Sequence, residues 1–265
     1  MTSSLVEYRI EQHIATITMN DPRTLNAFST SLKTEMMDAL NQADTDEQVR
    51  VIVLQGAGNN FSSGGHIGEM LENGIDSDAL ADKINFMVSE VAEISLKLRN
   101  IHKPIIAKLE GAVAGAGMNL ALTCDFRIAA DNAKFVQAFV NIGLVPDAGG
   151  IYLLNQLIGA AKTTELVMLG DKLTAEDMAR LNLLNEVISS DRLDASVLAL
   201  ATRLSNLPAK ALASMKHMIN THAFMGLNEA LDMEINQQTM MAQTEDFKEG
   251  ISAFMEKRQP VYQDK

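Results

Sequence analysis

Apolar residues in the first part of the chain follow two different spacings. Ile10, Ile14 and Ile17 alternate with polar side chains, which predicts a hairpin or a pair of half-buried strands. Residues 29–43 then place apolar side chains at helical spacing, and residues 49–58 form a continuous apolar run closed by glycines. Such a run is typical of a strand that is buried on both faces.

The same order of strand and helix repeats farther along the chain. The pattern predicts a helix over residues 78–99, a strand over 103–111, a helix over 115–125, short strands over 126–131 and 133–139, and a helix over 151–159. Strands that alternate with helices indicate an α/β layer architecture.

The remaining sequence has helical spacing almost throughout residues 160–258, with breaks at 170–171, 189–191, Pro208 and Gly226. The last predicted helix contains AFMEKR and ends before Pro260. No glycine- or serine-rich linker separates this part from the first. We therefore expect one α/β core over residues 1–200 and a helical region over residues 201–265, which packs on the same chain or on a neighbouring subunit.

Composition narrows the class of protein. Hydrophobic residues make up 47% of the 265 positions and charged residues 21%, values that exclude wholesale disorder. No apolar run approaches the roughly 20 residues of a membrane span, and the first residues lack a secretory signal pattern. The single cysteine, Cys124, suits a reducing compartment. A net charge of -12 argues against broad binding to nucleic acid or anionic membranes. We expect a soluble, cytoplasmic protein.

Two glycine-rich junctions are candidates for a ligand site. FSSGGHIGEM (61–70) and GAVAGAGMNLAL (111–122) each follow a predicted strand, and the second leads directly into a helix. A helix N-terminus offers amide N–H groups without intrahelical partners and a positive dipole end. Side by side, the two junctions would point two N–H donors at one oxygen, forming an oxyanion hole. From the spacing alone, tight turns and close helix packing are the better explanation of the glycines, because loose glycine motifs are weak evidence of a site.

Five blocks in this order resemble the crotonase (enoyl-CoA hydratase/isomerase) superfamily: NDPRTLNAFS, VIVLQGAGNNFSSGGHIGEM, KPIIAKLEGAVAGAGMNLALTCDFRIAAD, AKFVQAFVNIGLVPDAGGIYLL and DFKEGISAFMEKRQPVY. The resemblance implies an α/β fold with a crotonase-like spiral core of repeated ββα units, a C-terminal helical region, and homotrimers or pairs of trimers. It implies an acyl-CoA substrate, with coenzyme A as part of that substrate and no separate cofactor or metal. The oxyanion donors then fall on the N–H groups of Gly65 and Ala116.

The proton carriers of the hydratases are absent. Hydratases of this family use two glutamates, and the matching positions here are Asn119 and Phe139. An acid remains at Asp147, where the phenylacetate-pathway ring isomerases and related enoyl-CoA isomerases have their catalytic aspartate. One carboxylate is enough for a 1,3 proton shift next to a thioester, and burial would raise its pKa and help it act as a base and then as an acid. Alternatively, Asp147 caps the helix that begins near Ala148.

Further positions are less specific. His66 stands where the family usually has aspartate, and it is either a second proton carrier or a support of the loop. Glu69 is expected to point into solvent, and Glu110 to be structural. The other histidines show no metal-ligand spacing: His13, His102, His217 and His222. The resemblance implies these contacts to the acyl-CoA: Arg23, Ala27, Ser63, Gly64, His66, Ile67, Phe139, Phe254 and Lys257.

Four functions stay open at this point. The first is an enoyl-CoA isomerase, acting on a double bond or a ring through Asp147 and the amides of Gly65 and Ala116. The second is an enoyl-CoA hydratase with another proton carrier. The third is an acyl-CoA binding protein without turnover, and the fourth is a dehalogenase-like enzyme with a nucleophilic carboxylate.

Overall fold

The structure is a computed structural model that describes residues 4–75 and 79–263 of the chain. In chain order its elements are β1 (Val6–Glu11), β2 (Ile14–Met19), η1 (Pro22–Thr24), α1 (Thr30–Thr45), β3 (Val51–Gly56), α2 (Ile67–Met70), α3 (Leu80–Asn100), β4 (Ile105–Leu109), β5 (Ala112–Ala114), α4 (Ala116–Thr123), β6 (Phe126–Ala130), β7 (Lys134–Val136), η2 (Ala138–Ile142), α5 (Gly150–Leu169), β8 (Lys172–Thr174), α6 (Ala175–Arg180), β9 (Glu186–Ile188), η3 (Ser190–Arg192), α7 (Leu193–Ser205), α8 (Ala209–Ala223), α9 (Leu227–Met241) and α10 (Glu245–Glu256).

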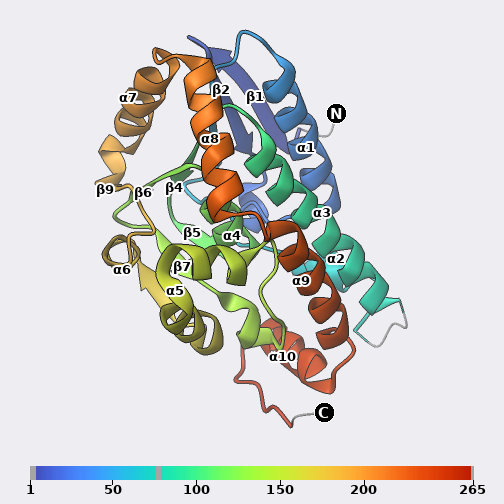
Figure 1. Ribbon diagram of the computed structural model, residues 1–265. Helices are drawn as coiled ribbons and strands as arrows, with labels where there is room; N and C mark the ends of the chain where they lie inside the picture. Colours follow the sequence, from blue (N-terminus) through green and yellow to red (C-terminus); the bar gives the residue numbers. More distant parts are fainter. Residues whose placement is uncertain (1–3, 76–78, 264–265) are drawn as a thin grey trace.

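The larger sheet has six strands in the order β1-β2-β3-β4-β6-β9 (Figure 1). Strands β1 and β2 form an antiparallel hairpin, and all the other neighbours pair in parallel. The predicted hairpin at the start of the chain is therefore confirmed. A parallel sheet places the ends of its strands at one edge, so the loops after β3 and β4 leave the sheet close together.

Strand β3 is buried on both faces, as its continuous apolar run predicts. Val51 and Val53 pack with the apolar residues of α7 on one face of the sheet. Ile52 and Leu54 point into the main core, which is completed by α1, α3 and α4. Burial on both faces explains why this strand lacks the alternation of β1.

In a smaller sheet of β5, β7 and β8, the strands β5 and β8 were not predicted. Residues 160–258 are not almost entirely helical, because β8 and β9 lie within them. The strand predicted over 133–139 is confined to β7, and the 3-10 helix η2 follows it. Three-residue strands are too short to show a period of two. They form because they pair with strands far away in sequence, β8 with β7 and β9 with β6.

The chain ends in three helices, α8, α9 and α10, which cross one side of the α/β core (orange to red in Figure 1). Helix α10 ends at Glu256, earlier than predicted, because Lys257 takes a left-handed conformation with φ of 56°. The helix predicted from Asp78 appears as α3, and Asp78 itself lies outside the described residues.

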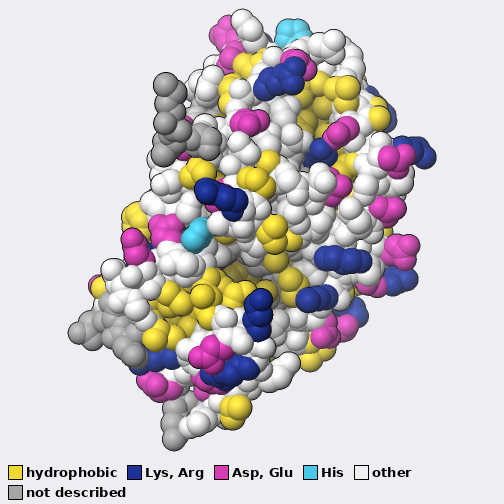
Figure 2. Space-filling model, turned by 180° about the vertical axis from the view of Figure 1, so that it is seen from behind, with side chains coloured by type: hydrophobic (Ala, Val, Ile, Leu, Met, Phe, Trp, Pro, Cys, Tyr) yellow, Lys and Arg dark blue, Asp and Glu magenta, His cyan; other side chains and the backbone are white. Residues whose placement is uncertain are grey.

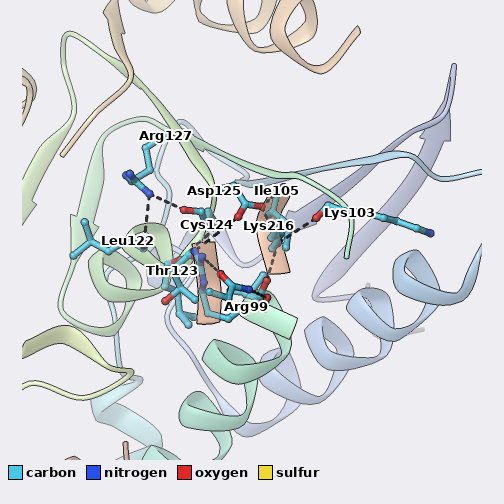
Figure 3. A network of polar contacts seen from close by, with 12 residues as sticks. Arg99, Lys103, Ile105, Leu122, Thr123, Cys124, Asp125, Arg127 and Lys216 are labelled. Atoms are coloured by element: carbon cyan, nitrogen blue, oxygen red, sulfur yellow. Dashed lines mark hydrogen bonds and ion pairs between the residues drawn. The ribbon is translucent and has the colours of Figure 1, made fainter. Parts of the chain in front are cut away.

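Charged side chains connect α8 to the core at the end of α4 (Figure 3). Arg99 and Arg127 donate hydrogen bonds to carbonyl groups at the end of α4, where cations interact favourably with the helix dipole. Lys216 of α8 lies 2.7 Å from the carboxylate of Asp125, whose same oxygen accepts a bond from the N–H of Ile105. This network fixes α4, and with it the loop that precedes α4.

Within residues 4–75 and 79–263, the structure contains no helix that is both long and apolar enough to span a bilayer.

Candidate active site

The two glycine-rich loops lie side by side. Ser62 forms a parallel bridge with Val113 of β5, and the N–H of Ala114 donates to the carbonyl of Ser62 at 2.9 Å. Gly64 brings the first loop against the second: a Cβ atom at this residue would lie 2.9 Å from the oxygen of Ala114 and 3.4 Å from the nitrogen of Ala116. With φ of 92°, this position also favours glycine for conformational reasons.

The predicted donors, the N–H groups of Gly65 and Ala116, have no hydrogen-bond partner in the part of the chain that the structure describes. Ala116 is the first residue of α4, so its N–H belongs to the positive end of that helix. Gly65 is exposed to solvent. Two free amide N–H groups on adjoining loops are suited to donate hydrogen bonds to an oxygen that gains negative charge.

Asp147 is buried, with an exposed fraction of 7%. Its Oδ1 atom has no hydrogen-bond partner among the described residues. Burial raises the pKa of Asp147 from 3.8 to about 7, although the positive charge of Lys33 and a bond to its own main chain oppose the rise. The carboxyl of Asp147 does not cap α5: the N-cap is Gly149, the N–H of Gly150 donates to the main-chain carbonyl of Asp147 at 2.9 Å, and the N–H groups of Gly149 and Ile151 donate to Glu234.

An ion pair between buried Lys33 and half-buried Glu90 was not predicted from the sequence. Lys33 of α1 is 1% exposed, and its Nζ lies 2.7 Å from Oε2 of Glu90 and 3.1 Å from the carbonyl oxygen of Met87. Its charge acts on Asp147. The signal was present in the sequence, because Lys33 lies between Leu32 and Met36 on the buried face of α1.

Asn119 and Phe139, the positions expected to match the glutamates of the hydratases, have structural contacts. The amide Nδ2 of Asn119 donates to the carbonyl of Asp147 at 2.8 Å, and its Oδ1 accepts from Gln137 at 2.7 Å. Phe139 is buried, and its ring lies beside Gly115 at the start of α4. Asn119 therefore holds the main chain of Asp147, and Phe139 belongs to the apolar surroundings of the site.

An apolar cluster extends from the glycine loops to the terminal helix. Its members come from α2, α3, η2, α9, α10 and the segments around them. The buried side chains are Met70, Leu80, Ile84, Met87, Val88, Phe139, Leu144, Ala242, Phe247 and Ile251, with Ile67, Leu71 and Ile75 packed against them. The surface on the side opposite to Figure 1 also carries apolar side chains. Figure 2 shows that they gather there in a hollowed strip with lysines and arginines beside it.

His66 supports the first loop. Its Nδ1 accepts the N–H of Glu69 at 2.9 Å and caps α2, so this nitrogen carries no proton in that bond. Glu69 does not point freely into solvent, as the sequence analysis expects, because its Oε2 accepts the N–H of Thr30 at 2.9 Å. Burial raises the pKa of Glu69, but the bonds from Thr30 outweigh it and hold that pKa below its ordinary value. These contacts attach the loop to the start of α1.

The other residues proposed to contact substrate fall into two groups. Ser63 and Ala27 belong to one network: the Oγ of Ser63 donates to the carbonyl of Thr24, and the N–H of Ala27 donates to the Oγ1 of Thr24. Arg23, Phe254 and Lys257 lie on the surface instead. The side chain of Arg23 is 89% exposed, and Phe254 is 57% exposed.

Comparison with known proteins gives consistent matches over nearly the whole chain. The family model described as enoyl-CoA hydratase/isomerase matches residues 9–265. The chain is 35% identical over 255 residues to trans-2-decenoyl-[acyl-carrier-protein] isomerase of Streptococcus mutans, covering 96% of each protein. It is 33% identical over 254 residues to 1,2-epoxyphenylacetyl-CoA isomerase of Escherichia coli, again covering 96% of each.

Among solved structures, an enoyl-CoA hydratase from Mycobacterium avium subsp. paratuberculosis matches with a TM-score of 0.85 and 31% identity, covering 98% of this chain and 99% of that one. This likeness confirms the crotonase-like α/β fold with a C-terminal helical region. Isomerases and hydratases both occur among these proteins, so the type of reaction has to be argued from the residues of the site.

Proposed function

Because the chain belongs to the enoyl-CoA hydratase/isomerase family, we propose that it is an enoyl-CoA isomerase with a single aspartate as proton carrier. The observation that carries this proposal is the buried carboxyl of Asp147, whose Oδ1 is unpaired within the described residues and whose pKa is raised to about 7 by burial. A group with this pKa is suited to accept and return a proton near neutral pH.

The proposed reaction moves one proton within the substrate. The carboxylate of Asp147 removes a proton from C2 of a 3-enoyl thioester, and the electron pair spreads into a dienolate. The N–H groups of Gly65 and Ala116 stabilise the charge on the thioester oxygen, each worth about 3–4 kcal/mol. Asp147 then returns the proton to C4, which leaves the 2-enoyl product. The step consumes no cofactor, because atoms and charge balance between the substrate and one carboxyl.

The surroundings of the site support an acyl-CoA as substrate. The apolar cluster around Phe139 and Leu144 suits an acyl group, and the basic side chains beside the apolar strip in Figure 2 suit phosphates. We propose that exposed Arg23, Phe254 and Lys257 contact the CoA part. The name of the Streptococcus relative makes an acyl-carrier-protein thioester the second substrate to test.

Hydration is the second candidate reaction, since the solved relative is an enoyl-CoA hydratase. Asn119 and Phe139 argue against it, because neither can transfer a proton. Wild-type protein, Asp147→Asn and, as a control, Asp171→Asn at an exposed position would each be assayed for isomerisation of a 3-enoyl-CoA and for hydration of crotonyl-CoA. We expect isomerisation that only Asp147→Asn abolishes. Rapid hydration that survives Asp147→Asn would identify a hydratase, and tight binding without turnover would identify a binding protein.

We also propose that the protein acts as a homotrimer or a pair of trimers in the cytoplasm. Large apolar side chains are exposed on its last helices, which supports an interface there: Met215, Met218, Ile219, Met233, Met240 and Met255. Light scattering after gel filtration should give three or six times the chain mass of 28.8 kDa. A monomer mass at micromolar concentration would contradict this part of the proposal.

A further inference from the structure

The turn that carries Asp147 has an unusual main chain. The two residues that follow, Ala148 and Gly149, both take positive φ, 55° and 83°. For alanine this conformation costs about 1–2 kcal/mol, so neighbouring contacts have to stabilise it. Two such contacts come from the core: Ser95 of α3 donates to the carbonyl of Ala148 at 2.9 Å, and Asn119 of α4 donates to the carbonyl of Asp147 at 2.8 Å.

The third contact comes from Glu234 of α9, a buried residue to which neither the sequence analysis nor the proposed reaction gives a role. Its Oε2 accepts the N–H of Gly149 at 2.7 Å, and its Oε1 accepts the N–H of Ile151 at 3.3 Å. Both amides belong to the beginning of α5, where N–H groups lack partners inside the helix. Glu234 thus joins the C-terminal helices to the residues directly after Asp147.

We propose that Glu234 is a positioning residue for Asp147: by binding the main chain at Gly149 and Ile151, it keeps the Asp147 carboxyl buried and unpaired. This inference rests on the proposed function, in which Asp147 carries the proton. The side chain of Glu234 does not touch the substrate in this role. It acts through the turn, because a displacement of about 1 Å at a reacting group can lower a rate by about 100-fold.

The charges around the turn are consistent with this role. Burial, with a smaller contribution from nearby Asp147, raises the pKa of Glu234 to about 8, although the N–H groups of Gly149 and Ile151 oppose the rise. The raised pKa of Glu234 favours its protonated form, which limits the negative charge beside Asp147. The other titratable side chains around the two carboxyls are Lys33 of α1, Glu90 of α3, Tyr152 of α5 and Glu229 of α9.

Replacement of Glu234 should open the turn to water. The residue borders a hollow of about 510 Å³ between α5 and α9, which Val145 and Pro146 also line. In Glu234→Ala this hollow extends to the amides of the turn, and the N–H groups of Gly149 and Ile151 lose their acceptor. Glu234→Gln keeps an acceptor oxygen for Gly149 at nearly the same place and should preserve the turn.

Three variants test the proposal through kinetics: Glu234→Ala, Glu234→Gln and the control Glu229→Ala, which changes an exposed glutamate of the same helix. For isomerisation we expect Glu234→Ala to lower kcat by about 100-fold and to change KM by less than about threefold. Glu234→Gln and Glu229→Ala should stay within about threefold of wild type. A purely structural role predicts a lower melting temperature with unchanged kcat, and that result would overturn the proposal.

A second readout does not depend on turnover. In protein labelled with ¹³C at aspartate carboxyls, the Asp147 signal is identified by its absence from Asp147→Asn. Its pKa should be about 7 in wild type, remain within about half a unit in Glu234→Gln, and fall by about one to two units in Glu234→Ala as water enters.

The two readouts separate this proposal from the proposed function. If wild type does not isomerise any 3-enoyl thioester, the proposed function fails. The titration of the Asp147 carboxyl still tests whether Glu234 keeps the turn after Asp147 in place. An unchanged Asp147 pKa in Glu234→Ala would refute the positioning role even in an active isomerase. Should Glu234→Ala not fold, Glu234→Asp serves instead: its side chain is one methylene shorter, and a wild-type kcat and Asp147 pKa in that variant would also refute the role.

Discussion

Asp147→Asn should abolish the proposed isomerisation and at the same time stabilise the folded protein. The pKa of Asp147 rises from 3.8 to about 7 on burial, and this difference corresponds to about 4 kcal/mol against the ionised form in the folded state. Asparagine has nearly the same shape and never ionises. The variant therefore loses the proton carrier and escapes the cost of a buried charge.

The sign of the effect fixes its dependence on pH. Between about pH 4 and pH 7 the unfolded chain loses the Asp147 proton while the folded chain keeps it, so ionisation favours the unfolded state as the pH rises. The stability of wild type should fall through this range relative to Asp147→Asn. The two proteins should be similar near pH 4, and the variant should be more stable by up to about 4 kcal/mol above pH 7.

Urea unfolding followed by circular dichroism at pH 5 and pH 8, at matched protein concentrations, measures this difference. Asp171→Asn makes the same chemical change at an exposed position and is the control. In parallel, kcat for isomerisation should fall by about 10³-fold, equivalent to about 4 kcal/mol of transition-state stabilisation. A stability difference between Asp147→Asn and wild type that is independent of pH would refute the reasoning, because Asp147 would then be ionised at little cost.

Three further predictions concern the surroundings of Asp147. Gly64→Ala should lower kcat by about 100-fold, because its Cβ displaces the loop that carries one amide donor. Gly65→Ala, whose Cβ has only one contact at 3.9 Å, should keep kcat within about tenfold of wild type. Equal kcat values for the two variants in steady-state kinetics would contradict this prediction. Lys33→Met removes the charge that lowers the pKa of Asp147, so the acid limb of kcat/KM should move to higher pH, and an unmoved limb would contradict this assignment. Burial raises the pKa of Cys124 to about 12, so a thiol reagent should modify it only after unfolding, and rapid modification of the native protein would be the contrary result.

The two glycine loops of the candidate site were predictable because their signals are local. Gly64 and Gly65, Ala116 and Asp147 lie in short motifs whose spacing survives in the linear sequence, and the structure brings both loops against one another. The strands β5, β8 and β9 were not predictable from their own residues. Each has three residues, too few for a hydrophobic period, and each forms through pairing with a partner elsewhere in the chain.

Lys33 and Glu234 show what the sequence alone does not predict about buried polar residues. Both interrupt the buried face of an otherwise amphipathic helix, Lys33 beside Leu32 and Glu234 in line with Leu227 and Leu231. That interruption is visible in the sequence and marks a buried polar group. It does not identify the partner, because the partner belongs to another element.

The sequence by itself determined the order of the longer strands and helices of the α/β core and the positions of the two glycine loops, and it predicts an aspartate rather than paired glutamates at the candidate site. These features depend on residue type and on near neighbours along the chain. Only the tertiary structure decided that Glu69 binds Thr30, that Glu234 holds the turn after Asp147, and that the pKa of Asp147 approaches neutrality. The reason is physical: desolvation and hydrogen bonding depend on which groups surround an atom in space, and those groups come from helices far apart in the sequence.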